Sequence, residues 1–167
     1  TSAINSIIYK EREANKVTEI KNNIQIKLIP EQLVVAHGWQ GAYSETGKAM
    51  GQIYRAAGRH SSGPALNLCY DGEYKEVADM ESCLPIKKQV KSKLACRVLP
   101  AQKCVSLVHQ GPYEKLGESY QAIFDYMNEN NLTMVLPTRE IYLKGPGMIF
   151  AGNPNKYLTE LLIPIAY

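Results

Sequence analysis

The sequence predicts an α+β domain made of two β-α-β-β units with pseudo-two-fold symmetry. We expect an antiparallel sheet with both helices on one face and a ligand cleft on the other. Three observations predict this fold: an ungapped internal repeat, a helical apolar stripe in each copy, and alternating strand segments around each stripe. Two copies of one unit imply a groove where they meet, and we expect the function to lie there.

The repeat joins segment 30–57 to segment 100–127 at a constant offset of seventy residues. Eight of the 28 aligned positions are identical, where unrelated sequence would give about two. The identical residues are Pro, Gln, Val, Gln, Gly, Tyr, Gly and Ile, at 30/100, 32/102, 35/105, 40/110, 41/111, 43/113, 47/117 and 53/123. We therefore divide a domain at 21–167 into repeat one, 24–88, and repeat two, 91–167.

Residues 1–20 lie outside the repeat and are polar apart from a short apolar set, Ile4, Ile7 and Ile8. We expect this segment to be a linker or the tail of a preceding helix. The chain starts with Thr1 instead of Met, which we interpret as a fragment or a processed chain. A signal peptide is not evident, and nothing approaches the roughly 20 apolar residues that cross a bilayer.

Strands are predicted by alternation in each repeat. Ile24, Ile26 and Leu28 alternate with polar residues, Pro30 interrupts the pattern, and 33–38 continues as extended chain. Segments 94–99 and 105–109 follow the same pattern around Pro100. Later strands are predicted at 65–70, 78–87, 139–143 and 156–166, with a hairpin signal at 71–72.

A helix follows a Gly-x-Tyr sequence in each repeat. The apolar positions of the first helix are spaced i, i+4, i+7, i+8 and i+11, and those of the second match them. Each set forms a single stripe, so each helix is expected to lie on a sheet. The positions are 46, 50, 53, 54 and 57 in the first repeat and 116, 120, 123, 124 and 127 in the second.

Composition argues against several function classes. The 19 basic and 16 acidic residues give a net charge of +3, with one local lysine run at 87–93, and no basic stripe typical of nucleic-acid binding. The four cysteines form no CxxC motif, so we expect reduced thiols in a cytoplasmic protein. The three histidines lack ligand spacing, and no metal is predicted. No dinucleotide, P-loop or GxSxG motif occurs, so no cofactor is expected.

Glu140 is the candidate for chemistry. Strand alternation places it with Tyr142 on one face, and Ile141 with Leu143 on the other. If the aliphatic pair faces the helices, Glu140 and Tyr142 face the concave side, where a carboxylate can neutralise a cation and an aromatic ring can stack on it. The alternative is a solvent-facing glutamate on an open sheet. A Cys104–His109 nucleophile is disfavoured, because a strand cysteine is usually core.

Aromatic residues supply the other candidates. Eleven Tyr against two Phe suits a groove that is both apolar and wet. For Tyr43 and Tyr113, which are repeated, capping of the sheet–helix junction is an equal alternative. The predicted ligand-binding residues, besides Glu140 and Tyr142, are Trp39, Tyr43, Tyr70, Tyr113 and Phe150.

Residues 24–167 resemble the GyrI-like small-molecule-binding domain, which also serves as the effector-binding domain of AraC- and MerR-type bacterial regulators. The resemblance rests on Gly-Pro-Tyr-Glu-Lys-Leu-Gly at 111–117, Pro-Thr-Arg-Glu-Ile-Tyr-Leu at 137–143, and Leu-Thr-Glu-Leu-Leu-Ile-Pro-Ile at 158–165. The first copy departs from it, with Gly-Ala-Tyr at 41–43 where many relatives have Gly-Pro-Tyr.

The resemblance implies a cleft for lipophilic, aromatic or cationic compounds, with the acidic residue at Glu140 and aromatic walls at Tyr113 and Tyr142. It also implies a non-catalytic sensing domain of a transcription regulator, which contacts DNA only through a separate domain upstream of Thr1 and is a possible homodimer. Two alternatives come with the resemblance: a hydrolase of cyclopropane-bearing genotoxins that uses Glu140, and a stand-alone gyrase-inhibitor-like protein.

Overall fold

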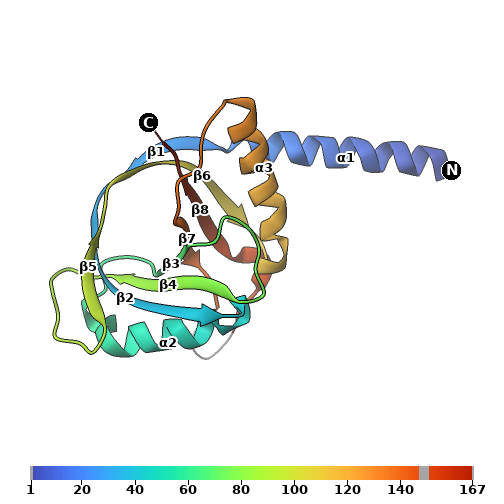
Figure 1. Cartoon of the computed structure of the whole chain (residues 1–167). Helices are drawn as coiled ribbons and strands as arrows, with labels where there is room; N and C mark the ends of the chain where they lie inside the picture. Colours follow the sequence, from blue (N-terminus) through green and yellow to red (C-terminus); the bar gives the residue numbers. More distant parts are fainter. Residues whose placement is uncertain (1, 147–150, 167) are drawn as a thin grey trace.

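The computed structural model describes residues 2–146 and 151–166, and within them the predicted α+β fold is confirmed. A single curled antiparallel sheet has the strand order β1-β6-β8-β7-β3-β4-β2-β5 (Figure 1). The helices are α1 (Ser2–Asn22), α2 (Thr46–Ala57) and α3 (Leu116–Glu129). The strands are β1 (Gln25–Ile29), β2 (Gln32–Gly41), β3 (Leu66–Cys69), β4 (Ala78–Pro85), β5 (Ala95–Leu99), β6 (Gln102–Gln110), β7 (Thr138–Lys144) and β8 (Leu158–Pro164).

The two apolar stripes form the helices that they predict. Ile53 of α2 packs into a core cluster with Val35 and Leu84, and Ile123 of α3 packs into another with residues of β6 and β8. Both isoleucines are fully buried, while the opposite side of each helix is exposed. Each helix therefore holds one end of the sheet, α2 over β2 and β4 and α3 over β6.

Strand register follows the seventy-residue offset. Gln25 of β1 lies opposite Ser106 of β6, and seventy residues further on Ala95 of β5 lies opposite Ala36 of β2. The first strand of each repeat thus pairs with a strand of the other repeat. The pseudo-two-fold relation itself stays a prediction, which superposition of 26–57 on 96–127 would measure.

Two ion pairs also join the repeats. Lys27 Nζ lies 2.8 Å from Glu160 Oε2, and Arg97 pairs with Glu81. Lys27 and Arg97 are seventy residues apart, and the two glutamates open the matching segments 81–86 and 160–165. Each pair therefore links a strand of one repeat to a strand of the other at equivalent places.

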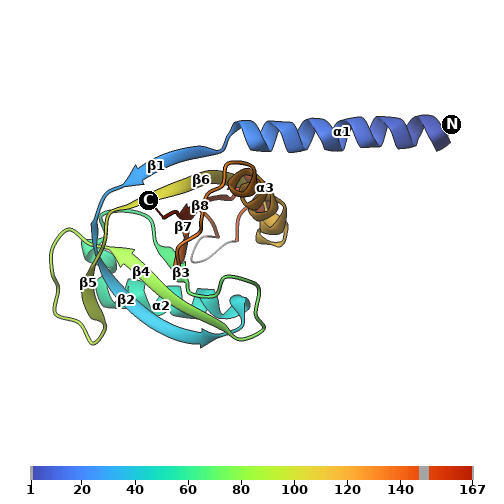
Figure 2. The ribbon, with the colours of Figure 1, turned by 45° about the horizontal axis from the view of Figure 1, so that its top comes forward.

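The predicted position of the cleft is wrong. Ile141 packs in a third cluster with Leu66, Leu68 and Cys83 on the face that carries no helix. Glu140, one residue away in β7, is turned toward the helices. The physical reason is the curl of the sheet (Figure 2), whose helix-free side is filled with aliphatic side chains. On the other side, α2 and α3 pack over the two ends of the sheet and leave a space above the central strands β3 and β7.

Segment 1–20, predicted as a linker or a helix tail, is mostly helix α1, which projects away from the body of the domain (Figures 1 and 2). Only its last turns touch α3, through Ile20 and the ion pairs Lys16–Glu118 at 3.0 Å and Lys21–Glu129 at 2.9 Å. None of the described helices is long and apolar enough to span a membrane. The cysteines are free thiols.

Candidate functional site

A cavity of about 1100 Å³ lies between α2 and α3, above the two central strands. Its floor is formed by β3 and β7, whose inward residues include Asn67, Cys69, Thr138, Glu140 and Tyr142. Its walls are the facing sides of the two helices and the short 3-10 turns before them, η1 (Tyr43–Glu45) and η3 (Tyr113–Lys115). The groove expected between the two repeats is therefore present, on the helix-bearing side of the sheet.

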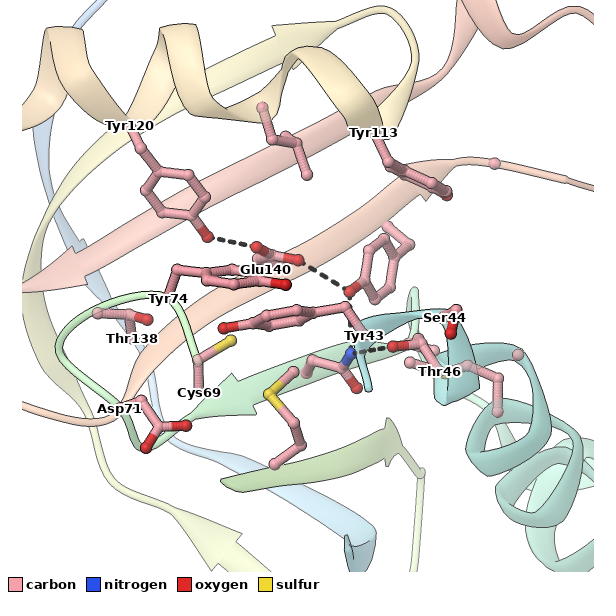
Figure 3. Close-up of a pocket in the computed structure, with 18 of the residues that line it drawn as sticks. Tyr43, Ser44, Thr46, Cys69, Asp71, Tyr74, Tyr113, Tyr120, Thr138 and Glu140 are labelled. Carbon is pink, nitrogen blue, oxygen red and sulfur yellow. Dashed lines mark hydrogen bonds between the residues drawn. The ribbon is translucent and has the colours of Figure 1, made fainter. Parts of the chain in front are cut away.

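Glu140 lies in the middle of the floor (Figure 3). The hydroxyl of Tyr120 on α3 donates to its Oε1, and the hydroxyl of Tyr142 donates to its Oε2 at 3.0 Å. In the stretches that the structure describes, Glu140 has no ion-pair partner. The carboxylate is thus held in place by two neutral donors, and no side chain of the described segments pairs with it as a cation.

A second line of hydrogen bonds supports the floor. Asn67 Nδ2 donates to the Tyr142 hydroxyl oxygen at 3.0 Å and to Thr46 Oγ1 at 3.3 Å. Asn67 Oδ1 accepts a hydrogen bond of 2.6 Å from the Ser82 hydroxyl, and Ser82 Oγ accepts one of 3.0 Å from Trp39 Nε1. These bonds connect β2, β4, β3 and β7 beneath the cavity.

Aromatic rings line the rim and the walls. Tyr43 stacks on Tyr74, with ring centroids 5.4 Å apart and planes at 27° (Figure 3). Across the cavity, Tyr113 makes an edge contact with Tyr142 at 5.9 Å and a tilted contact with Tyr157 at 5.4 Å. Tyr43 and Tyr113 are the repeated tyrosines, so one repeat-related ring stands on each side.

The floor tyrosines remain protonated. Burial raises the pKa of Tyr120 and of Tyr142 well above the ordinary value for tyrosine, and the charge of Glu140 adds to the rise. Both side chains are therefore neutral hydroxyl donors at physiological pH. Burial also raises the pKa of Tyr43 and Tyr113, which keeps the walls uncharged.

Cysteine and metal chemistry lack support at this site. Burial raises the pKa of Cys69, the floor thiol, far above its ordinary value, so the reactive thiolate is not formed. Cys104 is also held protonated, with a pKa raised to about 11 by burial, and His109 is engaged by Ser119 Oγ at 2.8 Å. Among the described residues, no group of three His, Cys, Asp or Glu side chains could hold a metal ion.

The structure brings four of the seven predicted site residues into the cavity lining: Tyr43, Tyr113, Glu140 and Tyr142. Trp39 is not in the lining and reaches the floor only through hydrogen bonds. Tyr70 donates to Glu81 at 2.8 Å and lies outside the lining. Phe150 falls outside the described residues.

Sequence reasoning missed Tyr120 and Asn67. Tyr120 was counted as one position of the apolar stripe of α3, although its hydroxyl reaches Glu140. Asn67 is a buried polar residue in the apolar strand 65–70, and this mismatch was the signal that could have found it.

A comparison with protein-family profiles identifies the family of this chain. The profile of the GyrI-like small molecule binding domain matches residues 22–166. The chain belongs to this family. No curated protein sequence gives a significant match. The GyrI-like match covers both repeats and every residue of the cavity lining, whereas most of α1 lies outside it.

Several solved structures share the fold at low identity. The C-terminal domain of EcmrR is 23% identical, with a TM-score of 0.74 over 86% of this chain and 96% of that one. EcmrR in its DNA complex has a TM-score of 0.73 and 23% identity over 97% of this chain, which spans 64% of the EcmrR chain. A hydrolase from Listeria innocua is 15% identical, with a TM-score of 0.64 over 93% of this chain and 98% of that one.

A further solved structure, SAV2435 bound to tetraphenylphosphonium, is 14% identical, with a TM-score of 0.57 over 86% of this chain and 93% of that one.

Proposed function

We propose that this GyrI-like domain is the sensing domain of a bacterial transcription regulator and that it binds a lipophilic aromatic or cationic compound above Glu140. One observation carries the proposal: a carboxylate without an ion-pair partner, among the described residues, lies at the floor of a cavity walled by tyrosines. A half-buried carboxylate favours a ligand that brings the compensating positive charge.

The walls suit the same ligand class. Tyr43 and Tyr74 on one side and Tyr113 on the other present ring faces and edges to the cavity. A cation over an aromatic face is attracted by about 0.5–2 kcal/mol, more where water is excluded. Flat apolar contacts tolerate many shapes, so we expect broad selectivity among aromatic cations. SAV2435, which shares this fold, is found bound to one such cation, tetraphenylphosphonium.

DNA contact would come through a separate domain. EcmrR, which shares this fold, is found in a complex with DNA, and its chain extends beyond the part that this chain spans. We propose the same arrangement here, in a cytoplasmic regulator, with α1 leading toward the DNA-binding part and with a homodimer as the assembly.

A hydrolase is the second candidate. The Listeria hydrolase shares the fold, and Glu140 with its two tyrosines has the groups needed to orient or deprotonate a water molecule. The receptor is favoured by the cavity, whose size and aromatic walls suit retention of a bulky ligand.

The receptor proposal is tested by titrating the domain calorimetrically with tetraphenylphosphonium and with neutral triphenylphosphine oxide. We expect saturable binding of the cation, weakened about 10- to 100-fold in Glu140→Gln, the scale of a charge-assisted contact. The neutral compound should not lose affinity with that substitution. Glu114→Gln, an exposed glutamate outside the lining, is the matched control. Absence of saturable cation binding, or equal losses for both ligands, would contradict the proposal.

A further inference from the structure

The hydrogen bonds beneath the cavity form one continuous chain. It begins at Trp39 Nε1, passes through the Ser82 hydroxyl and both ends of the Asn67 amide, and continues through the Tyr142 hydroxyl to Glu140 Oε2. The successive donor–acceptor distances are 3.0, 2.6, 3.0 and 3.0 Å. Every link is within ordinary hydrogen-bond range, so the chain transmits a defined orientation from one end to the other.

The direction of the chain is fixed at its outer end. An indole N–H can only donate, so Ser82 Oγ accepts from Trp39 and directs its own hydrogen to Asn67 Oδ1. This places the NH₂ group of the Asn67 amide toward Tyr142. Asn67 and Ser82 are both 0% exposed, so solvent does not offer either group a competing partner.

At the inner end, the hydrogen bonds run in the same donor-to-acceptor direction. The Tyr142 oxygen accepts from Asn67, and its single hydrogen is directed to Oε2 of Glu140. Tyr120 directs its hydrogen to the other carboxylate oxygen. Both phenolic hydrogens of the floor are thereby committed to Glu140, so the floor around this side chain offers acceptors to a ligand.

We propose that Asn67 is a positioning residue that sets ligand selectivity by holding the Tyr142 hydroxyl as a donor to Glu140. This inference rests on the proposed function, because it concerns how the same cavity chooses its ligand. A floor fixed in this way favours cations and N–H donors, and disfavours neutral ligands that carry a strong acceptor. Released from Asn67, the phenol of Tyr142 can turn its hydrogen toward a ligand acceptor.

The probes are methyltriphenylphosphonium, a cation, and triphenylphosphine oxide, a neutral compound of similar shape with a strong acceptor oxygen. Asn67→Leu keeps the volume of the side chain and removes both of its hydrogen-bonding ends. We expect the cation to bind about 3- to 10-fold more weakly, the scale of one net hydrogen bond, and the oxide to bind at least as tightly as before. The cation-to-oxide preference is the readout, because loss of packing alone would weaken both ligands together.

A double-mutant cycle tests whether Asn67 acts through Tyr142. In a Tyr142→Phe background the phenolic hydrogen is gone, so Asn67→Leu should change cation affinity by less than about twofold. An unchanged 3- to 10-fold effect in that background, or an unchanged cation-to-oxide preference in Asn67→Leu, would overturn the inference.

Ser82→Ala provides a milder variant if Asn67→Leu does not fold. It removes the hydroxyl that fixes the amide, so the cation-to-oxide preference should fall in the same direction. Ser106→Ala is the matched control, because Ser106 is a buried strand serine that takes no part in this series of hydrogen bonds. Its hydroxyl donates to Glu160 at 2.7 Å. Equal cation-to-oxide preferences in the two serine variants would also overturn the inference.

Failure of the proposed function would give a different result, because the unmodified domain itself would then not bind the cation saturably.

Discussion

Asn67 and Glu140 lie directly opposite each other on the adjacent antiparallel strands β3 and β7. They also occupy equivalent places in the two repeats. Ser82, the partner of Asn67 on β4, aligns with Leu161, the partner of Glu140 on β8, when segment 81–86 is laid over 160–165. The predicted pseudo-two-fold relation therefore matches an amide with a carboxylate, so the floor carries one acidic side chain where strict symmetry would give two.

Asn67→Asp should convert the floor to a site for dications. A second carboxylate at the equivalent position adds an attraction for a second positive charge, so a bis(triphenylphosphonium) alkane should gain about tenfold in affinity over tetraphenylphosphonium. Calorimetric titration of both ligands against both proteins measures this ratio. A ratio that does not change would mean that position 67 does not face the bound charge.

Glu140→Gln separates the receptor from the hydrolase. In a receptor the substitution weakens cation binding, and no product forms from an electrophilic cyclopropane compound with either protein. In a hydrolase, turnover of that compound would fall by about 10²–10⁴, the usual contribution of a general base, while its binding stays largely intact. Product formation followed by mass spectrometry, together with affinity, decides between them. We expect the receptor result.

Tyr74→Ala should weaken retention of the ligand. Tyr74 is 75% exposed and stacks on Tyr43 at the rim, so it covers the cavity without supporting the core. Loss of one aromatic contact should weaken cation binding about 3- to 10-fold, mostly through faster dissociation, measurable by stopped-flow fluorescence. Tyr9→Ala on α1 removes a similarly exposed tyrosine (66%) and should have no effect. The same loss in both variants would argue against a role for the rim.

Acid stability should depend on Glu81. Burial alone would raise the pKa of this carboxyl, but hydrogen bonds from Arg97 and Tyr70 and the charge of Arg97 outweigh burial and lower it. A lowered folded-state pKa contributes stability that is present above the unfolded value near 4.5 and is lost as pH falls through the folded value. The free energy of unfolding, measured with urea between pH 7 and pH 3, should therefore fall less steeply with decreasing pH in Glu81→Gln than in the unmodified protein.

Glu31→Gln, which alters an exposed glutamate in the turn between β1 and β2, serves as the control for this experiment. Its free energy of unfolding should fall with decreasing pH as steeply as that of the unmodified protein. Parallel declines for all three proteins would show that the Glu81–Arg97 pair does not couple folding to pH.

Local patterns predicted the elements better than their arrangement. The apolar stripes located α2 and α3, and strand alternation correctly placed Glu140 and Tyr142 on a shared face. Alternation does not say which of two faces is covered by helices, because both faces of β7 are partly apolar. The side of the sheet is decided by its curl, which depends on contacts between strands far apart in sequence, such as Ile141 with Leu66.

Aromatic residues were harder to place for a related reason. Trp39 and Tyr70 both have the amphipathic character of a groove residue, and each satisfies its polar tip on a side chain outside the cavity lining, Ser82 and Glu81 respectively. Tyr120 satisfies its tip on Glu140, inside the cavity. Residue type does not distinguish these outcomes, because the choice depends on which partner the fold brings within hydrogen-bond range.

The exchange of first strands has a consequence for each half of the chain. A polypeptide cut between 88 and 91 would leave β1 without β6 and β2 without β5, so each fragment would keep an unpaired strand edge. Two copies of one fragment could cover these edges by trading β1 strands or β5 strands. We therefore expect an isolated half to be found as an intertwined pair or as an aggregate, and the intact chain to melt in one cooperative step.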